Sequence, residues 1–159
     1  MSLLLSFRVD GEAQPAGSKS SFVPLHPKTK QPYRGPGGRI IVNTVDACKK
    51  SGPWKKHVGK IAREAMGGRD PFAGPLRLVV RFYQVRPKCQ YRTGKFAELL
   101  RDDAPAFPLG APDTTKLFRG TEDGMGGICF VNDSQVVDQF SSKRYGSEAF
   151  VLVEIWSVE

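Results

Sequence analysis

The chain has 159 residues, enough for one domain with a sizeable core that needs neither disulfides nor a structural metal. Its hydrophobic fraction of 40% and charged fraction of 25% are ordinary for a soluble globular protein, and no apolar run approaches the roughly 20 residues that span a bilayer. The net charge is +8. Because the first residues also lack the basic start and long apolar stretch of a signal peptide, we expect a cytoplasmic protein with no membrane partner.

The N-terminal part predicts one strand followed by a long loop. Leu5, Phe7 and Val9 alternate with polar residues, which is the period of a half-buried strand ending at residue 10. Residues 11–39 are rich in Pro, Gly, Ser and basic residues without an apolar period, so we expect an ordered loop, followed by a short strand over residues 39–43. The basic residues and glycines of the loop suit contact with a phosphate backbone. A merely flexible surface loop is the alternative.

The clearest helix prediction covers residues 53–66. Pro53 suits the first turn of a helix, and Gly67 suits its end. One face of this helix is apolar. The other carries charge of nearly one sign, which favours contact with a nucleic-acid backbone over simple solvation; its basic residues are Lys55, Lys56, Lys60 and Arg63.

The middle of the chain predicts a strand and then an irregular segment. Apolar residues alternate over residues 76–83, which predicts the strand. Residues 86–111 show no regular period and are expected to run over the surface, with one short helix near residues 96–100.

The C-terminal part predicts a second helix and two strands. The helix is expected over residues 114–125 with Asp113 as its N-cap. Strands are expected at residues 134–145 and 150–156 and are predicted to pair as an antiparallel hairpin around Gly146 and Ser147, with the last strand near the middle of the sheet. The predicted fold is a single α+β domain whose mixed, mostly antiparallel sheet packs with two main helices.

Cysteine and histidine do not suggest a site. Cys48, Cys89 and Cys129 are odd in number and widely spaced, so we expect reduced thiols rather than a disulfide framework or a metal-ligand pattern. His26 and His57 are the only histidines. A Cys/His zinc site or a histidine-dependent nuclease motif is therefore not expected.

Charge is divided unevenly along the chain. Residues 1–101 hold 20 Lys and Arg against 6 Asp and Glu, a balance of +14, whereas residues 102–159 hold 4 against 10, a balance of −6. Within one domain over residues 1–159, this asymmetry suggests a basic part that binds a polyanion and an acidic part that binds a metal ion. Unevenly spread solubility charge is the alternative.

Asp113 and Asp133 stand at the two ends of a predicted helix-turn-strand unit, and Arg119 follows the first of them within the helix. Carboxylate oxygens are the ligands that a hard divalent cation such as Mg²⁺ prefers, and phosphate chemistry uses such a cation. Carboxylates near helix starts are also common for capping reasons alone.

These segments together resemble the RusA family of Holliday junction resolvases, which is common in bacteria and their prophages. The resemblance runs over most of the chain and is carried by residues 11–19, 52–55, 74–76, 112–137 and 143–146. Its most specific piece is Pro112-Asp113 followed by Asp133-Ser134-Gln135-Val136-Val137. The resemblance implies a homodimer that binds four-way DNA junctions and nicks two strands symmetrically with Mg²⁺ or Mn²⁺, in recombination or in processing of phage DNA.

The resemblance also implies roles for single residues. Asp113 and Asp133 match two metal-ligand aspartates, and Arg119 stands at a cation position where it can stabilise charge on the attacked phosphate. Thr115 stands where the family has the second Asp of an Asp-x-Asp pattern, so one carboxylate is missing. Thr115 itself and Asn132, which directly precedes Asp133, are additional candidate ligands.

Two neighbouring acids of the second helix have weaker assignments. Asp123 matches a further acidic position but lies ten residues from Asp113, about 15 Å along a helix, and is therefore not expected to share a metal with it. An i,i+4 ion pair with Arg119 is its alternative role. Glu122 or a water molecule is a candidate replacement for the missing carboxylate.

Eight basic residues are expected to contact the DNA backbone and to make binding strongly salt-dependent; they are Lys19, Arg34, Arg39, Lys55, Lys56, Lys60, Lys143 and Arg144. Two alternatives remain open. The first is a protein that binds junctions or other branched DNA with weak or no cleavage because of Thr115. The second is a basic nucleic-acid-binding module whose acidic residues are structural.

Overall fold

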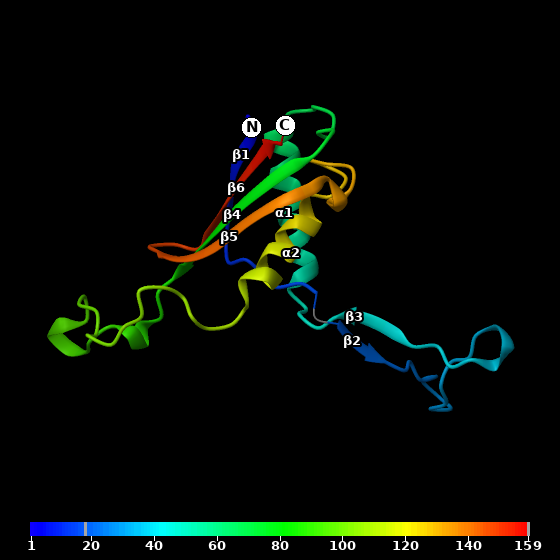
Figure 1. Ribbon diagram of the computed structural model, residues 1–159. Coiled ribbons are helices and arrows are strands. Elements are labelled where there is room, and N and C mark those ends of the chain that lie inside the picture. Colours follow the sequence, from blue (N-terminus) through cyan, green and yellow to red (C-terminus); the bar gives the residue numbers. More distant parts are fainter. Residues whose placement is uncertain (18, 159) are drawn as a thin grey trace.

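The computed structural model describes residues 1–17 and 19–158. Its main sheet has four strands in the order β1-β6-β4-β5, with β6 antiparallel to both neighbours and β5 parallel to β4. Two helices cover one face of this sheet (Figure 1). These elements are β1 (Leu3–Asp10), α1 (Ser51–Met66), β4 (Leu76–Val85), α2 (Thr114–Met125), β5 (Val136–Gly146) and β6 (Phe150–Ser157). The predicted α+β fold is therefore confirmed.

The core lies between the sheet and the two helices. In β1, β4 and β6 every second residue is buried, as the apolar alternation predicts. The fully buried side chains include Val9, Leu78, Val80, Phe82, Leu117, Met125, Val151, Val153 and Ile155. Each buried side chain of this size contributes about 1.5–3 kcal/mol relative to exposure. No helix of the described residues is long and apolar enough to cross a membrane.

The two helices are confirmed near their predicted bounds. α2 has the predicted bounds, and α1 begins two residues earlier than expected, at Ser51. Gly67 ends α1 with a φ of 58°, and its N–H donates to the carbonyls of Arg63 and Glu64. The left-handed conformation at this position favours glycine. The position of Gly67 in the sequence therefore predicted the end of this helix correctly.

Glycines on α2 allow its neighbours to approach closely. A Cβ on Gly124 would lie 2.8 Å from the Cβ of Val58 and 2.9 Å from the carbonyl oxygen of Lys55, both on α1. A Cβ on Gly120 would lie 2.4 Å from the carbonyl oxygen of Gln14. Real side chains do not occupy such space, so α1 and the loop after β1 rest directly on the backbone of α2.

The predicted hairpin of the last two strands is wrong. β5 pairs only with β4 among the strands of the sheet described, and β4 separates it from β6. The turn over residues 147–149 therefore carries the chain across the end of β4. Turn residues indicate that the chain reverses, but they do not tell whether another strand lies between the two. The central position predicted for the last strand is confirmed, because β6 lies between β1 and β4.

Two short predictions are also wrong. The strand predicted at residues 39–43 begins only at Asn43: β3 (Asn43–Asp46) pairs antiparallel with β2 (Lys19–Phe22) in a separate two-stranded sheet. No helix forms at residues 96–100, and a single 3-10 turn covers Gly94–Phe96. β2 has all four residues exposed, so it lacks the apolar period by which the sequence indicates a strand.

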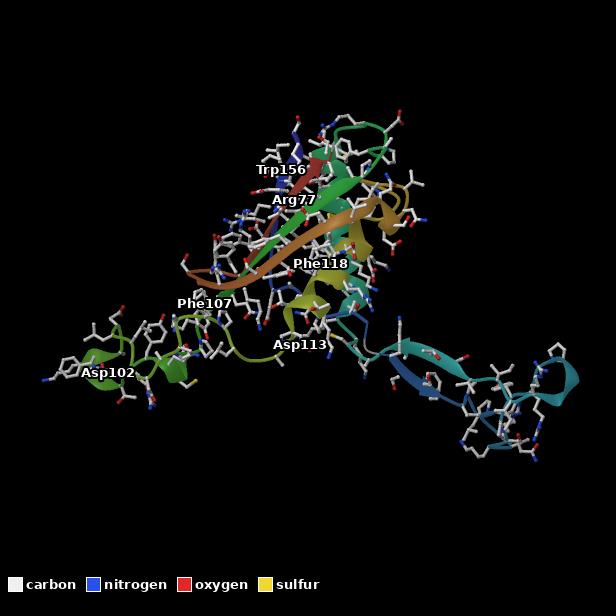
Figure 2. All side chains as sticks on the ribbon, in the orientation of Figure 1. Arg77, Asp102, Phe107, Asp113, Phe118 and Trp156 are labelled. Atoms are coloured by element: carbon white, nitrogen blue, oxygen red, sulfur yellow. The ribbon has the colours of Figure 1, made fainter. Side chains whose placement is uncertain are left out.

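Two segments extend away from the core at one end (Figure 1). We call residues 19–46, which contain β2 and β3, the basic arm, and residues 86–111 the second arm. Figure 2 shows Asp113 between the places where the two arms leave the core. The end of the core that carries the N-terminus lies away from both arms (Figure 1).

The base of the second arm is fastened to β5. The guanidinium of Arg86 lies 3.9 Å from the ring centre of Tyr145 and donates to Gln90 Oε1 and to the carbonyl of Pro105, each at 2.8 Å. Gln90 Nε2 donates to the Tyr145 hydroxyl at 2.9 Å. Phe107, labelled in Figure 2, lies under the guanidinium of Arg144 at 4.8 Å. The direction in which the arm leaves the core is therefore fixed by side-chain contacts.

Candidate active site

Three of the predicted site residues lie together at the start of α2. Asp113 is the N-cap residue as predicted, but its side chain makes no capping hydrogen bond. Its Oδ2 lies 3.3 Å from Nζ of Lys116, in an exposed i,i+3 pair that stabilises the helix only slightly. Thr115 and Arg119 line the same surface hollow, which we call the Asp113 hollow. A carboxylate, a hydroxyl and a guanidinium are thus available in one place.

The loop after β1 lies against the side chain of Arg119, which remains exposed. Ala16 N–H donates to the carbonyl of Lys116 at 2.9 Å, which ties the loop to α2. The next residue, Gly17, has a φ of +93°, and a Cβ there would lie 3.0 Å from the Cδ of Arg119. Glycine therefore lets the loop adopt this turn while it stays in contact with the arginine.

Asp133 is presented by a short turn that precedes β5. Asn132 and Gln135 form a capping box around it: Asn132 Oδ1 accepts from Ser134 N–H at 3.0 Å, and Gln135 Oε1 accepts from Asn132 N–H at 3.0 Å. Gln135 Nε2 also donates to the carbonyls of Phe72 and Gly74, at 3.0 and 3.2 Å. The turn that carries Asp133 is therefore stabilised by hydrogen bonds within itself and by hydrogen bonds to the segment before β4.

Gln135 positions the turn that carries Asp133, a role that was not predicted from the sequence. The spacing of Asn132 and Gln135 is that of a capping box and would have indicated it. The amide oxygen of Asn132, a candidate metal ligand from the sequence, serves as a helix cap in this structure.

Asp133 shares its hollow with other acids. This second hollow, which we call the Asp133 hollow, is lined by Glu122 and Asp123 from the end of α2 and by Lys55 from α1. Asp123 Oδ2 lies 2.8 Å from Nζ of Lys55. The ion pair proposed between Asp123 and Arg119 is therefore replaced by a bridge between the two helices, and Lys55 has a carboxylate partner within the chain.

Glu122 is the most perturbed carboxyl of this group. Its partial burial first, and then the nearby charges of Asp133 and Asp123, raise its pKa to about 7, while Arg119 acts in the opposite direction. The folded protein therefore holds this proton more tightly than the unfolded chain, in which the pKa is near 4.5. Stability is consequently expected to fall as the pH rises from about 4.5 to about 7 and to change little above that.

Replacing Glu122 by Gln tests this expectation. The amide keeps the size of the side chain but cannot ionise, so the variant should unfold at a higher temperature than the parent at pH 8 and at nearly the same temperature at pH 4.5. Thermal unfolding at a series of pH values, with EDTA present, measures both. A parent and variant with parallel pH profiles would contradict the role given to Glu122.

The Asp113 and Asp133 hollows lie at opposite ends of α2. Asp113 precedes the first residue of the helix, whereas Asp133 faces residues 122 and 123 near its last turn. The helix has 12 residues and is thus about 18 Å long. In the part of the chain described, no three His, Cys, Asp or Glu side chains are grouped so that they could hold a metal ion. One chain alone does not bring the predicted ligands together.

Of the eight predicted DNA contacts, Lys55 pairs with Asp123, and the other seven fall into two groups. Lys19, Arg34 and Arg39 lie on the basic arm, and Lys56 and Lys60 lie on the exposed face of α1. These five residues are placed where a nucleic acid can reach them.

Lys143 and Arg144 are engaged within the chain. Lys143 Nζ donates to the carbonyls of Gly110 and Pro112, at 2.7 and 3.0 Å, immediately before Asp113. Arg144 lies over the ring of Phe107. Both side chains therefore fix the segment that joins the second arm to α2.

Comparison with known proteins identifies a family to which the chain is similar. The family model described as Endodeoxyribonuclease RusA matches residues 24–156, which are most of the chain and include Asp113, Arg119 and Asp133. No curated protein matches the chain.

Proposed function

The chain belongs to the RusA endodeoxyribonuclease family, and from this we propose that it resolves four-way DNA junctions by cutting two strands symmetrically. The observation that carries the proposal is that the family match includes Asp113, Arg119 and Asp133, the residues expected to perform the reaction. The structural support is the placement of Asp113 and Arg119 in one hollow beside a basic arm. We further propose that the reaction depends on Mg²⁺ or Mn²⁺, which supplies activation of water and neutralisation of the attacked phosphate when it is bound.

Two chains are needed for this proposal. Since one chain separates Asp113 from Asp133, we propose a homodimer in which Asp113 of one chain lies close to the partner subunit's Asp133. Thr115, Arg119 and Asp123 lie along the exposed side of α2. Two such helices that pack antiparallel across a two-fold axis would place opposite ends side by side. A junction with two-fold symmetry also requires two equivalent centres.

Arg119 acts electrostatically in this proposal. A guanidinium stays protonated at any working pH, so it does not serve as general acid or base. Its position in the Asp113 hollow suits it to hold the scissile phosphate and to stabilise the charge that develops there.

A second candidate function is binding of branched DNA with little or no cleavage. Thr115 lines the Asp113 hollow, so a neutral hydroxyl stands where a second carboxylate is expected.

The experiment that separates the two candidate functions incubates a synthetic four-way junction with the protein and Mg²⁺ and resolves the products on a denaturing gel. Paired nicks that disappear in Asp133→Asn support the resolvase. Tight binding without nicks, with nicks gained in Thr115→Asp, supports the second candidate, whereas equal affinity for junction and linear duplex contradicts both.

Lys143 is expected to position Asp113 rather than to bind DNA. Lys143→Met keeps the length of the side chain but removes both hydrogen bonds to the segment before Asp113. Hydrogen bonds from a charged group are worth about 1.5–3 kcal/mol, so we expect single-turnover cleavage to slow by roughly tenfold or more, with unchanged affinity for the junction. A variant that cleaves normally but binds more weakly, with a shallower salt dependence, would instead show a phosphate contact.

A further inference from the structure

We propose that the basic arm and the second arm bind branched DNA on the two sides of Asp113, with different roles. The basic arm lies along the phosphate backbone of a duplex, and the tip of the second arm packs against unstacked bases at the branch point. This inference rests on the proposed function, because it takes branched DNA as the ligand.

The first observation is where the arms begin. A hollow that adjoins the Asp113 hollow is lined by Ala47 and Cys48 at the root of the basic arm and by Ala111 and Pro112 at the end of the second arm, with Asp113 among them. Both arms project from this end of the core (Figures 1 and 2). A DNA strand that reaches Asp113 therefore lies beside both roots.

The second observation is the charge of the basic arm. Residues 19–45 contain five Lys and Arg and no Asp or Glu. Their β2–β3 ribbon is two-stranded and lies apart from the main sheet, with Ser21 and Thr44 hydrogen-bonded across it at 3.0 Å. Such a ribbon is marginally stable alone. Its excess of positive charge suits a phosphate backbone.

The third observation is that the second arm uses its charges internally. Arg92 pairs with Asp102 at 2.6 Å, and Arg101 pairs with Asp103 at 3.0 Å. Asp102 lies toward the outer part of the arm in Figure 2. These pairs leave the arm with less free positive charge than its count of basic residues suggests.

The tip of the second arm, residues 94–100, presents three exposed apolar side chains beside Lys95 and Glu98. Phe96, Leu99 and Leu100 are 47%, 52% and 42% exposed, and Lys95 Nζ lies 5.1 Å from the ring centre of Phe96. Apolar side chains presented in this way insert between base steps or stack on unpaired bases. Because the base of the arm is fastened to β5, the tip is held at a fixed place relative to Asp113.

A second copy of the chain is a poorer occupant for this tip. Stable interfaces bury about 800 Å² on each partner. Three half-exposed side chains offer on the order of 300 Å². Unstacked bases of a branched DNA therefore fit the tip better.

The tip is tested with Phe96→Ser combined with Leu99→Ser. We expect affinity for a four-way junction to fall about tenfold, with affinity for linear duplex and the salt dependence unchanged. The fluorescence of 2-aminopurine placed at the branch point should rise when the parent binds and not when the variant binds. Leu3→Ser, which removes a side chain that is 50% exposed at the other end of the core, is the control. Equal loss for junction and duplex, no loss for either, or a change in oligomeric state on sizing would overturn this role.

The basic arm is tested with Lys28→Gln combined with Arg39→Gln. We expect junction and linear duplex to be bound more weakly to the same degree, and the slope of log K against log salt to become shallower by about 2. The control is Arg8→Gln combined with Arg81→Gln, which removes two cations that already pair with carboxylates on the sheet, Arg8 with Asp10 and Arg81 with Glu154. An unchanged slope in the arm variant would overturn this role.

The outcomes separate this inference from the proposed function. A parent protein that binds junctions through both arms but never nicks them would contradict the nuclease alone. A parent that nicks junctions while both arm variants bind like it would contradict the arms alone. A parent with no affinity for either DNA would contradict both.

Discussion

Asp133→Asn is expected to slow strand cleavage by about 1,000-fold while junction binding stays intact. Asparagine keeps the size of the side chain and leaves the capping box of Asn132 and Gln135 in place, so the turn before β5 is preserved. What is lost is the negative charge that a divalent cation requires. Binding should not weaken, because the substitution removes a charge that repels DNA. Single-turnover cleavage and gel-shift titration on the same junction measure the two quantities.

The matched control for this prediction is Asp138→Asn. Asp138 also lies near the start of β5, but it pairs with Arg77 on the neighbouring strand, at 3.3 Å. The substitution Asp138→Asn removes the same charge at a place outside both hollows, so we expect the cleavage rate to stay near that of the parent. Asp113→Asn should behave like Asp133→Asn. Cleavage by Asp133→Asn at a rate close to that of the control would contradict the assignment.

Gly124→Val is expected to lower the free energy of unfolding by about 3 kcal/mol or to prevent folding. The added Cβ alone would lie 2.8 Å from the Cβ of Val58 and 2.9 Å from a backbone oxygen of α1, and neither can move without displacing the helix. The two helices would be forced apart, and the buried side chains between them would lose their contacts.

Gly126→Val is the control for this substitution. A Cβ on Gly126 meets its nearest atom, the carbonyl oxygen of Asp123, at an ordinary 3.9 Å. Urea denaturation of both variants measures the difference in unfolding free energy. Similar midpoints for the two variants would show that the closeness of α1 and α2 does not depend on Gly124.

Local signals allowed both helices to be predicted from the sequence. α2 has the predicted bounds because an N-cap residue, an apolar face and terminal glycines all lie within its own segment. The strand pairing was not predictable in the same way, since the partner of β5 is set by β4, more than fifty residues earlier. The irregular character of residues 86–111 was predicted, but the extension of both arms away from the core and the pairing of β2 with β3 were not, because these mostly exposed segments show no apolar period.

The sequence predicted which residues are candidates for the site, but it did not predict how they are arranged in space. Asp113 and Asp133 were recognisable by motif, but the helix between them keeps them at opposite ends of α2. The internal partners of Lys55 and Lys143 were not recognisable, because a basic residue in a sequence does not show whether a carboxylate or a carbonyl lies beside it. Family resemblance predicted the chemistry, and the fold places the two predicted ligands in separate hollows of one chain.

The most direct test of a centre shared between two chains combines two inactive variants in one dimer. Asp113→Asn and Asp133→Asn are given different tags, co-expressed, and the mixed dimer is purified. If Asp113 acts with the partner subunit's Asp133, the mixed dimer holds one intact centre and one that lacks both carboxylates. We expect it to nick one strand of each junction, whereas each variant alone nicks none. A mixed dimer as inactive as its parents would contradict the shared centre.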